Sequence, residues 1–170
     1  MKTKFLSLTA ALVWAFVSSA SAEVTTKLSG VHLCCQSCVK GVAAAAGKVA
    51  GAKLACDKDA GTVSITANDK ATVQKAVDAL VAGGYFGTSS NPDIKVTAHT
   101  AAAGKVTTLK VSGVHLCCGK CVTAVSNALR TVKGVTGNDA AKGSETFTVT
   151  GDFSPAEVYA ALEKAGLTGK

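Results

Sequence analysis

The stretch Ser29–Val39 reads Ser-Gly-Val-His-Leu-Cys-Cys-Gln-Ser-Cys-Val, and it recurs at Ser112–Val122 as Ser-Gly-Val-His-Leu-Cys-Cys-Gly-Lys-Cys-Val. Nine of the eleven positions are identical, and the second copy begins 83 residues after the first. Six of the seven cysteines of the chain lie within the two copies. This repeat predicts two similar structural units, each built around a loop that is rich in thiols.

Each copy contains a Cys-x-x-Cys pair, Cys35 with Cys38 and Cys118 with Cys121. The apolar spacing that follows predicts a helix, so the first cysteine of each pair should lie in a loop and the second in the first helical turn. The N–H groups at the start of a helix favour the thiolate form. Two converging thiolates suit Cu(I), or Zn(II) with additional ligands. The same pair can instead cycle between dithiol and disulfide, or form a structural disulfide.

The first 22 residues have the pattern of a secretory signal peptide. Lys2 and Lys4 give a basic start, an apolar run extends from Phe5 to Val17, and Ala20-Ser21-Ala22 is a small-residue cleavage site. The apolar run is too short to span a bilayer. We therefore expect a mature chain that starts near Glu23 and is secreted or periplasmic.

The charge of the chain argues against a nucleic-acid partner. The formal net charge of +7 falls to about +5 without the two lysines of the signal sequence, and the remaining basic residues are scattered singly. Aromatic residues make up only 5% of the chain. Nucleic-acid-binding surfaces need clustered basic residues, often with aromatic residues among them, so we expect no such partner.

The repeat divides the mature chain into two small domains. We expect a first domain over residues 23–98, a linker over residues 99–105 and a second domain over residues 106–170. The linker is rich in alanine and polar residues, which is typical of a flexible connection. We therefore expect the two domains to fold and to bind their ligands separately.

The first domain has the pattern strand, helix, strand, strand, helix. A strand is expected at residues 24–29, and a helical stripe runs from Val39 through Ala43 to Val49 before Gly51 ends the helix. Two strands flank a turn at residues 57–61, and Thr72 is expected to cap the second helix.

The second domain repeats this order up to a helix that begins at a Ser154-Pro155-Ala156-Glu157 capping box. The chain ends four residues after Gly166, so a full fourth strand is not expected. The order predicts an α+β fold, with two tandem ferredoxin-like βαββα(β) sandwiches and the second lacking a full fourth strand.

At this point the sequence resembles the heavy-metal-associated domain found in copper chaperones, metal-pumping ATPases and periplasmic mercury-binding proteins. The resemblance covers nearly all of both units. It rests on the first strand running into the loop, Cys-x-x-Cys-Val at the helix start, and the glycine pairs Gly51/Gly134 and Gly84/Gly166. The resemblance implies that the paired thiols carry the metal, which here are Cys35 with Cys38 and Cys118 with Cys121.

The chain departs from the family just ahead of each pair. The family usually has Gly-Met there, whereas this chain has His32-Leu33 and His115-Leu116. Leucine can replace methionine as a buried apolar anchor. An extra cysteine, Cys34 or Cys117, also precedes each pair. These two residues are candidates for third metal ligands, for vicinal disulfide partners, or for plain loop residues.

Four further residues draw attention. Adjacent side chains in an extended loop point to opposite sides, so His32 and His115 are expected to be loop histidines with local hydrogen bonds rather than ligands. Cys56 alternates with Leu54 and is expected to be a small buried residue, although an odd thiol in an exported protein can also pair between molecules. His99 in the linker is expected to be solvated.

The sequence therefore predicts an exported soft-metal-binding protein, a metallochaperone or scavenger that holds Cu(I) or a similar ion in each domain. Zn(II), Hg(II) and Cd(II) are alternative ions. The expected metal ligands are Cys35, Cys38, Cys118 and Cys121, with Cys34 and Cys117 as candidate additions. We expect a monomer without a membrane span whose partner is a metal transporter or acceptor protein.

We expect no enzymatic activity, and the alternative function is thiol–disulfide exchange. Against that alternative, the two prolines, Pro92 and Pro155, do not offer the proline that thioredoxin-like proteins place beside their active thiols. A third possibility is a scaffold whose cysteines form cross-links in an oxidising compartment.

Overall fold

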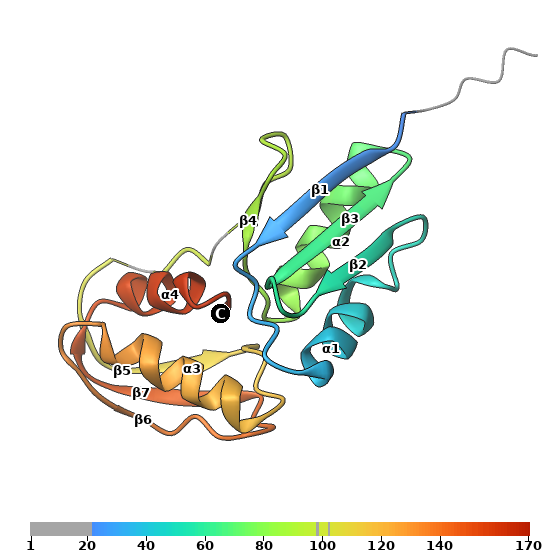
Figure 1. Cartoon of the computed structure of the whole chain (residues 1–170). Coiled ribbons are helices and arrows are strands. Elements are labelled where there is room, and N and C mark those ends of the chain that lie inside the picture. The colour runs from blue at the N-terminus through green and yellow to red at the C-terminus, as the bar shows by residue number, and fades with distance from the viewer. Residues whose placement is uncertain (1–21, 98, 102) are drawn as a thin grey trace, which may run out of the picture.

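The computed structural model describes residues 22–97, 99–101 and 103–170, and it shows two units that lie against one another (Figure 1). The expected signal peptide lies outside the described residues except for Ala22. Within these ranges, no helix combines the length and the hydropathy that crossing a bilayer requires.

The first unit is a four-stranded antiparallel sheet with two helices. Its elements are β1 (Val24–Ser29), α1 (Gln36–Ala46), β2 (Lys53–Asp57), β3 (Thr62–Ala67), α2 (Lys70–Ala82) and β4 (Thr88–Ser89). The strands lie in the order β2-β3-β1-β4, and each neighbouring pair is antiparallel. This is the ferredoxin-like arrangement that the sequence predicts.

The core of the first unit lies between the sheet and its two helices. The strands alternate, so that Leu28 of β1 is buried opposite Val63 of β3. The inner face of α2 matches the prediction and contains Val73, Ala76, Val77 and Leu80. The inner face of α1 contains Cys38, Val42 and Ala46, whereas Ala43, which was expected there, is exposed. Burying one Val or Leu side chain stabilises a fold by about 1.5–3 kcal/mol, so these faces hold the helices on the sheet.

The second unit repeats the first with three strands. Its elements are β5 (Val106–Ser112), α3 (Gly119–Arg130), β6 (Val135–Asn138), β7 (Thr146–Phe153) and α4 (Pro155–Lys164), and the strand order is β5-β7-β6. Ser112 and Lys170 exchange backbone hydrogen bonds of 2.8 and 2.9 Å. In the first unit, Thr88 of β4 lies beside Ser29 in the same way. Lys170 thus takes the place that β4 has in the first unit, and the described part of the second unit has three strands, as the sequence predicts.

Two predicted helix boundaries differ from the structure. Asp69, not Thr72, caps α2, because its carboxylate accepts hydrogen bonds from the N–H and the hydroxyl of Thr72, both 2.8 Å long. The first helix ends at Ala46, before the expected Gly51. At α4 the predicted Ser154 cap and Pro155 start are correct, but the serine side chain makes no capping hydrogen bond.

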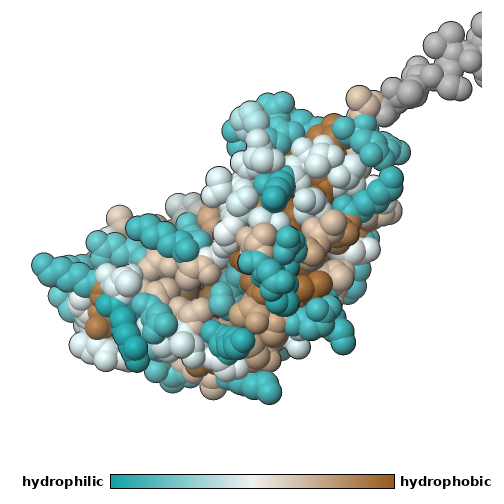
Figure 2. Space-filling model, viewed as in Figure 1, coloured by the Kyte–Doolittle hydropathy of each residue, from teal (hydrophilic) through white to brown (hydrophobic). Residues whose placement is uncertain are grey.

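The two units are docked through backbone contacts, which differs from the expectation of domains joined only by a linker. Tyr85, just after α2, pairs with Leu167, just after α4, as an antiparallel bridge. The N–H of Thr168 donates to the carbonyl of Gly84 at 3.1 Å, and the N–H of Phe86 donates to the carbonyl of Gly166 at 3.1 Å. Figure 1 shows the C-terminal segment lying between the two units. Hydrophilic residues are spread over both units on the face shown in Figure 2, with paler residues between them.

Two glycines allow this close approach. Gly84 has a φ of +85°, and a Cβ added there would lie 2.4 Å from the carbonyl oxygen of Gly113 in the other unit. Gly166 has a φ of +76°, and an added Cβ would lie 2.2 Å from the carbonyl oxygen of Gly30. Each glycine therefore does more than end its helix. It lets the segment after the helix press against the cysteine loop of the other unit.

We predict that Gly84→Ala and Gly166→Ala each separate the units and lower the free energy of unfolding by at least about 2 kcal/mol, because a clash with backbone adds to left-handed strain. Gly143→Ala is the matched control. Gly143 has a φ of +78° but nothing within 4 Å of an added Cβ, so the control carries the strain without the clash. Chemical denaturation measures stability, and small-angle scattering measures separation. Equal effects at all three positions would contradict the docking contact.

Candidate metal centre

The six cysteines of the repeated stretches come together in one cluster between the units. Within the first unit, Sγ of Cys38 lies 3.5 Å from that of Cys34 and 3.8 Å from that of Cys35. The corresponding distances from Cys121 to Cys117 and Cys118 are both 3.7 Å. The sulfur atoms of different units are as close, since Cys34 is 3.4 Å from Cys118. All of these distances exceed the roughly 2.05 Å of a disulfide bond, and the thiols are free.

The start of a helix positions the cysteines in each unit. Cys35 and Cys118 are the N-cap residues of α1 and α3 in extended conformation, and Cys38 and Cys121 lie in the first turns, fully buried. This is the local placement that the sequence predicts. Leu33 and Leu116 are each 4% exposed and anchor the two loops in the core.

Contacts across the interface make the two loops into one site. Sγ of Cys34 lies 3.6 Å from that of Cys121, and Sγ of Cys38 lies 3.6 Å from that of Cys117. Sulfur atoms of the first unit therefore have sulfur atoms of the second unit as direct neighbours. The two cysteine loops, expected to form separate sites, therefore lie together in one cluster. Cys34 and Cys117, which the sequence left as candidate ligands, lie in this cluster and contact the pair of the other unit, and the two pairs also contact each other through Cys35 with Cys118 and Cys38 with Cys121.

The close pairs define a simple shape. Sulfur pairs at 3.4–3.9 Å, together with the adjacent cysteines that lie within 4.8 Å of each other, form the edges of an octahedron. The opposite corners are Cys34 and Cys117, Cys35 and Cys121, and Cys38 and Cys118. The three sulfur atoms of each triangular face are mutual neighbours, and no group of four sulfur atoms is.

The thiols differ in acidity. The backbone N–H of Cys38 at the start of α1 is the main cause that lowers the pKa of Cys35 to about 6, and the N–H of Cys121 likewise lowers the pKa of Cys118. Burial raises the pKa values of Cys34, Cys117 and Cys121. Cys35 is thus largely a thiolate at neutral pH, and the pKa of Cys118 is shifted in the same direction.

We predict that iodoacetamide at pH 7 modifies Cys35 and Cys118 of the reduced, metal-free protein well before Cys34 and Cys117. The physical reason is that the thiolate is the reactive form, and at this pH most of the Cys35 thiol is ionised. Peptide mass spectrometry of timed samples measures the order. Modification of all four cysteines at the same rate would contradict the difference in pKa between the N-cap thiols and the thiols that precede them.

The histidines behind the cluster have unequal environments. The hydroxyl of Tyr85 donates to the carbonyl of Cys38 at 2.9 Å and lies 3.0 Å from Nε2 of His115, so that nitrogen donates to the phenol oxygen. The rings of Tyr85 and His115 lie 4.6 Å apart between centroids. His115 is therefore a satisfied loop histidine, as expected, and it helps to hold the two units together.

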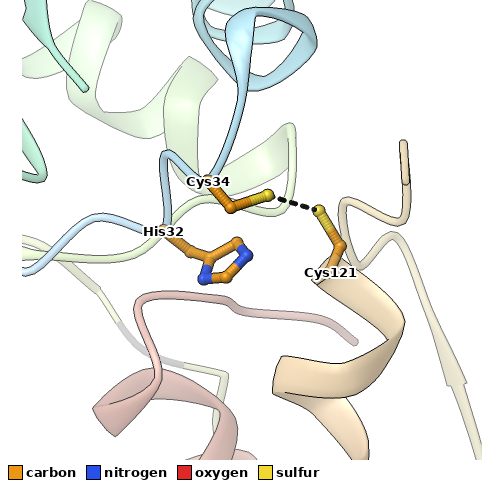
Figure 3. A group of neighbouring side chains, drawn as sticks. All are labelled: His32, Cys34 and Cys121. Carbon is orange, nitrogen blue, oxygen red and sulfur yellow. Dashed lines mark hydrogen bonds between the residues drawn. The ribbon is translucent and has the colours of Figure 1, made fainter. Parts of the chain in front are cut away.

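His32, the counterpart of His115, lacks such a partner because Leu167 stands where the other unit has Tyr85. Its Nε2 is buried without a hydrogen bond, which holds for no other side-chain nitrogen or oxygen in the described ranges. A ring nitrogen of His32 lies within 4.8 Å of the sulfur atoms of Cys34 and Cys121, and Figure 3 shows the ring beside these two thiols. The expectation that His32 is satisfied locally is wrong.

We predict that Tyr85→Phe lowers the free energy of unfolding by about 1–3 kcal/mol, because it leaves the carbonyl of Cys38 and the ring of His115 without their partner. Tyr159→Phe is the control, since the ring of Tyr159 packs against His99 and is retained in the variant. Urea denaturation of the reduced protein measures both. A loss in Tyr85→Phe no larger than in the control would show that the buried hydroxyl contributes little.

The remaining predicted residues lie apart from the sulfur atoms. Cys56 is half-buried on β2, where burial raises the pKa of its thiol, in keeping with a small core residue. His99 is exposed, as expected, and its ring lies 4.4 Å from that of Tyr159. Sequence reasoning missed Tyr85. The available signal was a paired difference between the repeats: the first has Gly41 with Tyr85, and the second has Ala124 with Leu167 at the corresponding positions. The glycine is needed beside the tyrosine, because a Cβ at Gly41 would lie 2.1 Å from the hydroxyl of Tyr85.

No protein-family model matches this sequence. Among solved structures, the N-terminal soluble domains of Bacillus subtilis CopA align over 88% of this chain and 94% of that one, with 16% identity and a TM-score of 0.29. The first two RRM domains of the yeast poly(U)-binding protein Pub1 align over 86% of this chain and 96% of that one, with 12% identity and a TM-score of 0.24. At these scores neither similarity bears on the function of this chain.

Proposed function

We propose that this chain is an exported protein that binds a soft metal ion, most favourably Cu(I), and delivers or sequesters it. The observation that carries the proposal is the cluster of six free thiols within contact distance. Thiolate ligands select soft ions such as Cu(I) over hard ones. The residues that would hold the metal are Cys34, Cys35, Cys38, Cys117, Cys118 and Cys121.

The spacing of the sulfur atoms supports three-coordinate binding. With a metal–sulfur bond of about 2.3 Å, three thiolates around one ion stand about 4 Å apart and two on opposite sides of an ion stand about 4.6 Å apart. The observed 3.4–3.9 Å fits the former. A tetrahedral Zn(II) site needs four mutually adjacent donors, and an octahedron of sulfur atoms offers only triangles.

Zn(II) remains the alternative ion because His32 supplies a nitrogen as a fourth donor beside the sulfur atoms of the cluster. Its ring nitrogen is within 4.8 Å of Cys34 and Cys121, and neutral imidazole is a common zinc ligand. In that case His32→Ala lowers the affinity for Zn(II) at least tenfold, whereas Cu(I) held by sulfur alone is unaffected. A competition titration with each ion distinguishes the two.

The signal-peptide pattern of the first 22 residues supports a role outside the cytoplasm, and we propose cleavage after Ala22. We further propose a binding role without catalysis, in which an acceptor protein takes the metal from the exposed edge of the cluster. Intact mass of the exported protein tests the cleavage site. An insulin-reduction assay tests the alternative of thiol–disulfide exchange, in which the protein would accelerate reduction.

We predict that anaerobically purified protein retains Cu(I) against a competing chelator and that X-ray absorption shows three sulfur neighbours for each ion. Binding weakens as the pH falls, because protons compete for thiolates such as Cys35, whose pKa is about 6. Cys56→Ser is the control and leaves both results unchanged. Nitrogen or oxygen neighbours in place of sulfur, or full metal content after complete oxidation of the thiols, would contradict cysteine ligation.

A further inference from the structure

We infer that the cluster holds four Cu(I) ions as one thiolate-bridged core shared by the two units, rather than one ion in each Cys-x-x-Cys pair. This inference rests on the proposed function and specifies the form in which the metal is held. It follows from the octahedral arrangement of the six sulfur atoms across the interface.

An octahedron has eight triangular faces, and four of them can be chosen so that no two share an edge. In such a set each corner belongs to two faces. One such set of faces is Cys34–Cys35–Cys38, Cys35–Cys117–Cys118, Cys38–Cys117–Cys121 and Cys34–Cys118–Cys121. An ion on each face has three sulfur neighbours, and every thiolate bridges two ions. The six thiols present therefore complete the coordination of four three-coordinate ions with none left over.

A site within one Cys-x-x-Cys pair explains the geometry less well. Three of the four faces contain cysteines from both units, so an ion confined to one pair would leave the crossing contacts unused. Cys34 lies closer to Cys118 of the other unit, at 3.4 Å, than to Cys38 of its own unit, at 3.5 Å. Cys117 likewise lies 3.6 Å from Cys38 and 3.7 Å from Cys121.

Electrostatics favours a larger number of cations. Six thiolates at these separations repel one another strongly in a partly buried site, so cations must neutralise them. Each thiol gives up one proton on binding. Two Cu(I) ions on six thiolates leave a formal charge of about −4, whereas four leave about −2. Because all four ions share bridging sulfur atoms, binding of the first favours the rest.

The test is an anaerobic titration of the full, reduced chain with Cu(I), followed by native mass spectrometry and X-ray absorption. We expect the four-ion species to accumulate directly from the metal-free one, with copper–copper scattering in the absorption spectrum. A population dominated by one and two ions without such scattering would overturn the shared core while leaving metal binding intact. Failure to retain any Cu(I) would overturn the proposed function as well.

Variants outside the Cys-x-x-Cys pairs separate the two arrangements. Cys117→Ser removes a corner of the octahedron, so the four-ion species should be lost. Independent pairs would be unaffected by this change. Cys56→Ser is the matched control, also half-buried but outside the cluster, and it should retain four ions. Circular dichroism checks that both variants fold. Two ions bound to both variants and to the unaltered protein would refute the shared core.

A second variant tests the need for docking. Gly84→Ala lies outside the cysteine loops and interferes with the contact between units. We expect it to reduce the four-ion species in favour of forms with fewer ions, whereas Gly143→Ala retains it. If Gly84→Ala separates the units by small-angle scattering but keeps four bridged ions, the core does not depend on the interface and the inference is wrong.

Discussion

The contact on which this structure depends is the insertion of the segment after each second helix against the cysteine loop of the other unit. Gly84 and Gly166 permit it, since any side chain at either position would overlap the backbone opposite. The hydrogen bonds from Phe86 to Gly166 and from Thr168 to Gly84, on either side of the paired Tyr85 and Leu167, fix the register of this contact. With the two loops held face to face, thiols that are 83 or 84 residues apart in sequence come within 3.4–3.9 Å of one another.

Docking changes the chemistry available to the cysteines. A Cys-x-x-Cys pair at a helix start offers two thiolates on one side of an ion. Here two such pairs face each other, and each is preceded by one more cysteine. The space between them is therefore surrounded by six sulfur donors. The N–H groups that lower the pKa of Cys35 and Cys118 favour anionic sulfur at the centre, and cations are needed to balance that charge.

The near-symmetry of the two units is broken behind the cluster. Tyr85 ties His115 to the backbone of Cys38, so that the second unit's loop is held by the first. Leu167 cannot do the same for His32, whose buried nitrogen faces Cys34 and Cys121 without a partner. One side of the cluster is thus braced by a hydrogen bond, while the other keeps a nitrogen donor available.

The sequence by itself determined the two units, their ferredoxin-like order and the position of Cys35 and Cys38 at a helix start, because apolar periodicity and N-terminal helix chemistry act over a few residues. It also indicated that the second unit lacks a full fourth strand, and the described residues form three strands there. Only the tertiary structure decided that the two cysteine loops share one site. That result depends on backbone approach at Gly84 and Gly166, on the register of Tyr85 with Leu167, and on the direction in which Cys34 and Cys117 point. Such contacts join distant parts of the chain, and no local pattern encodes them.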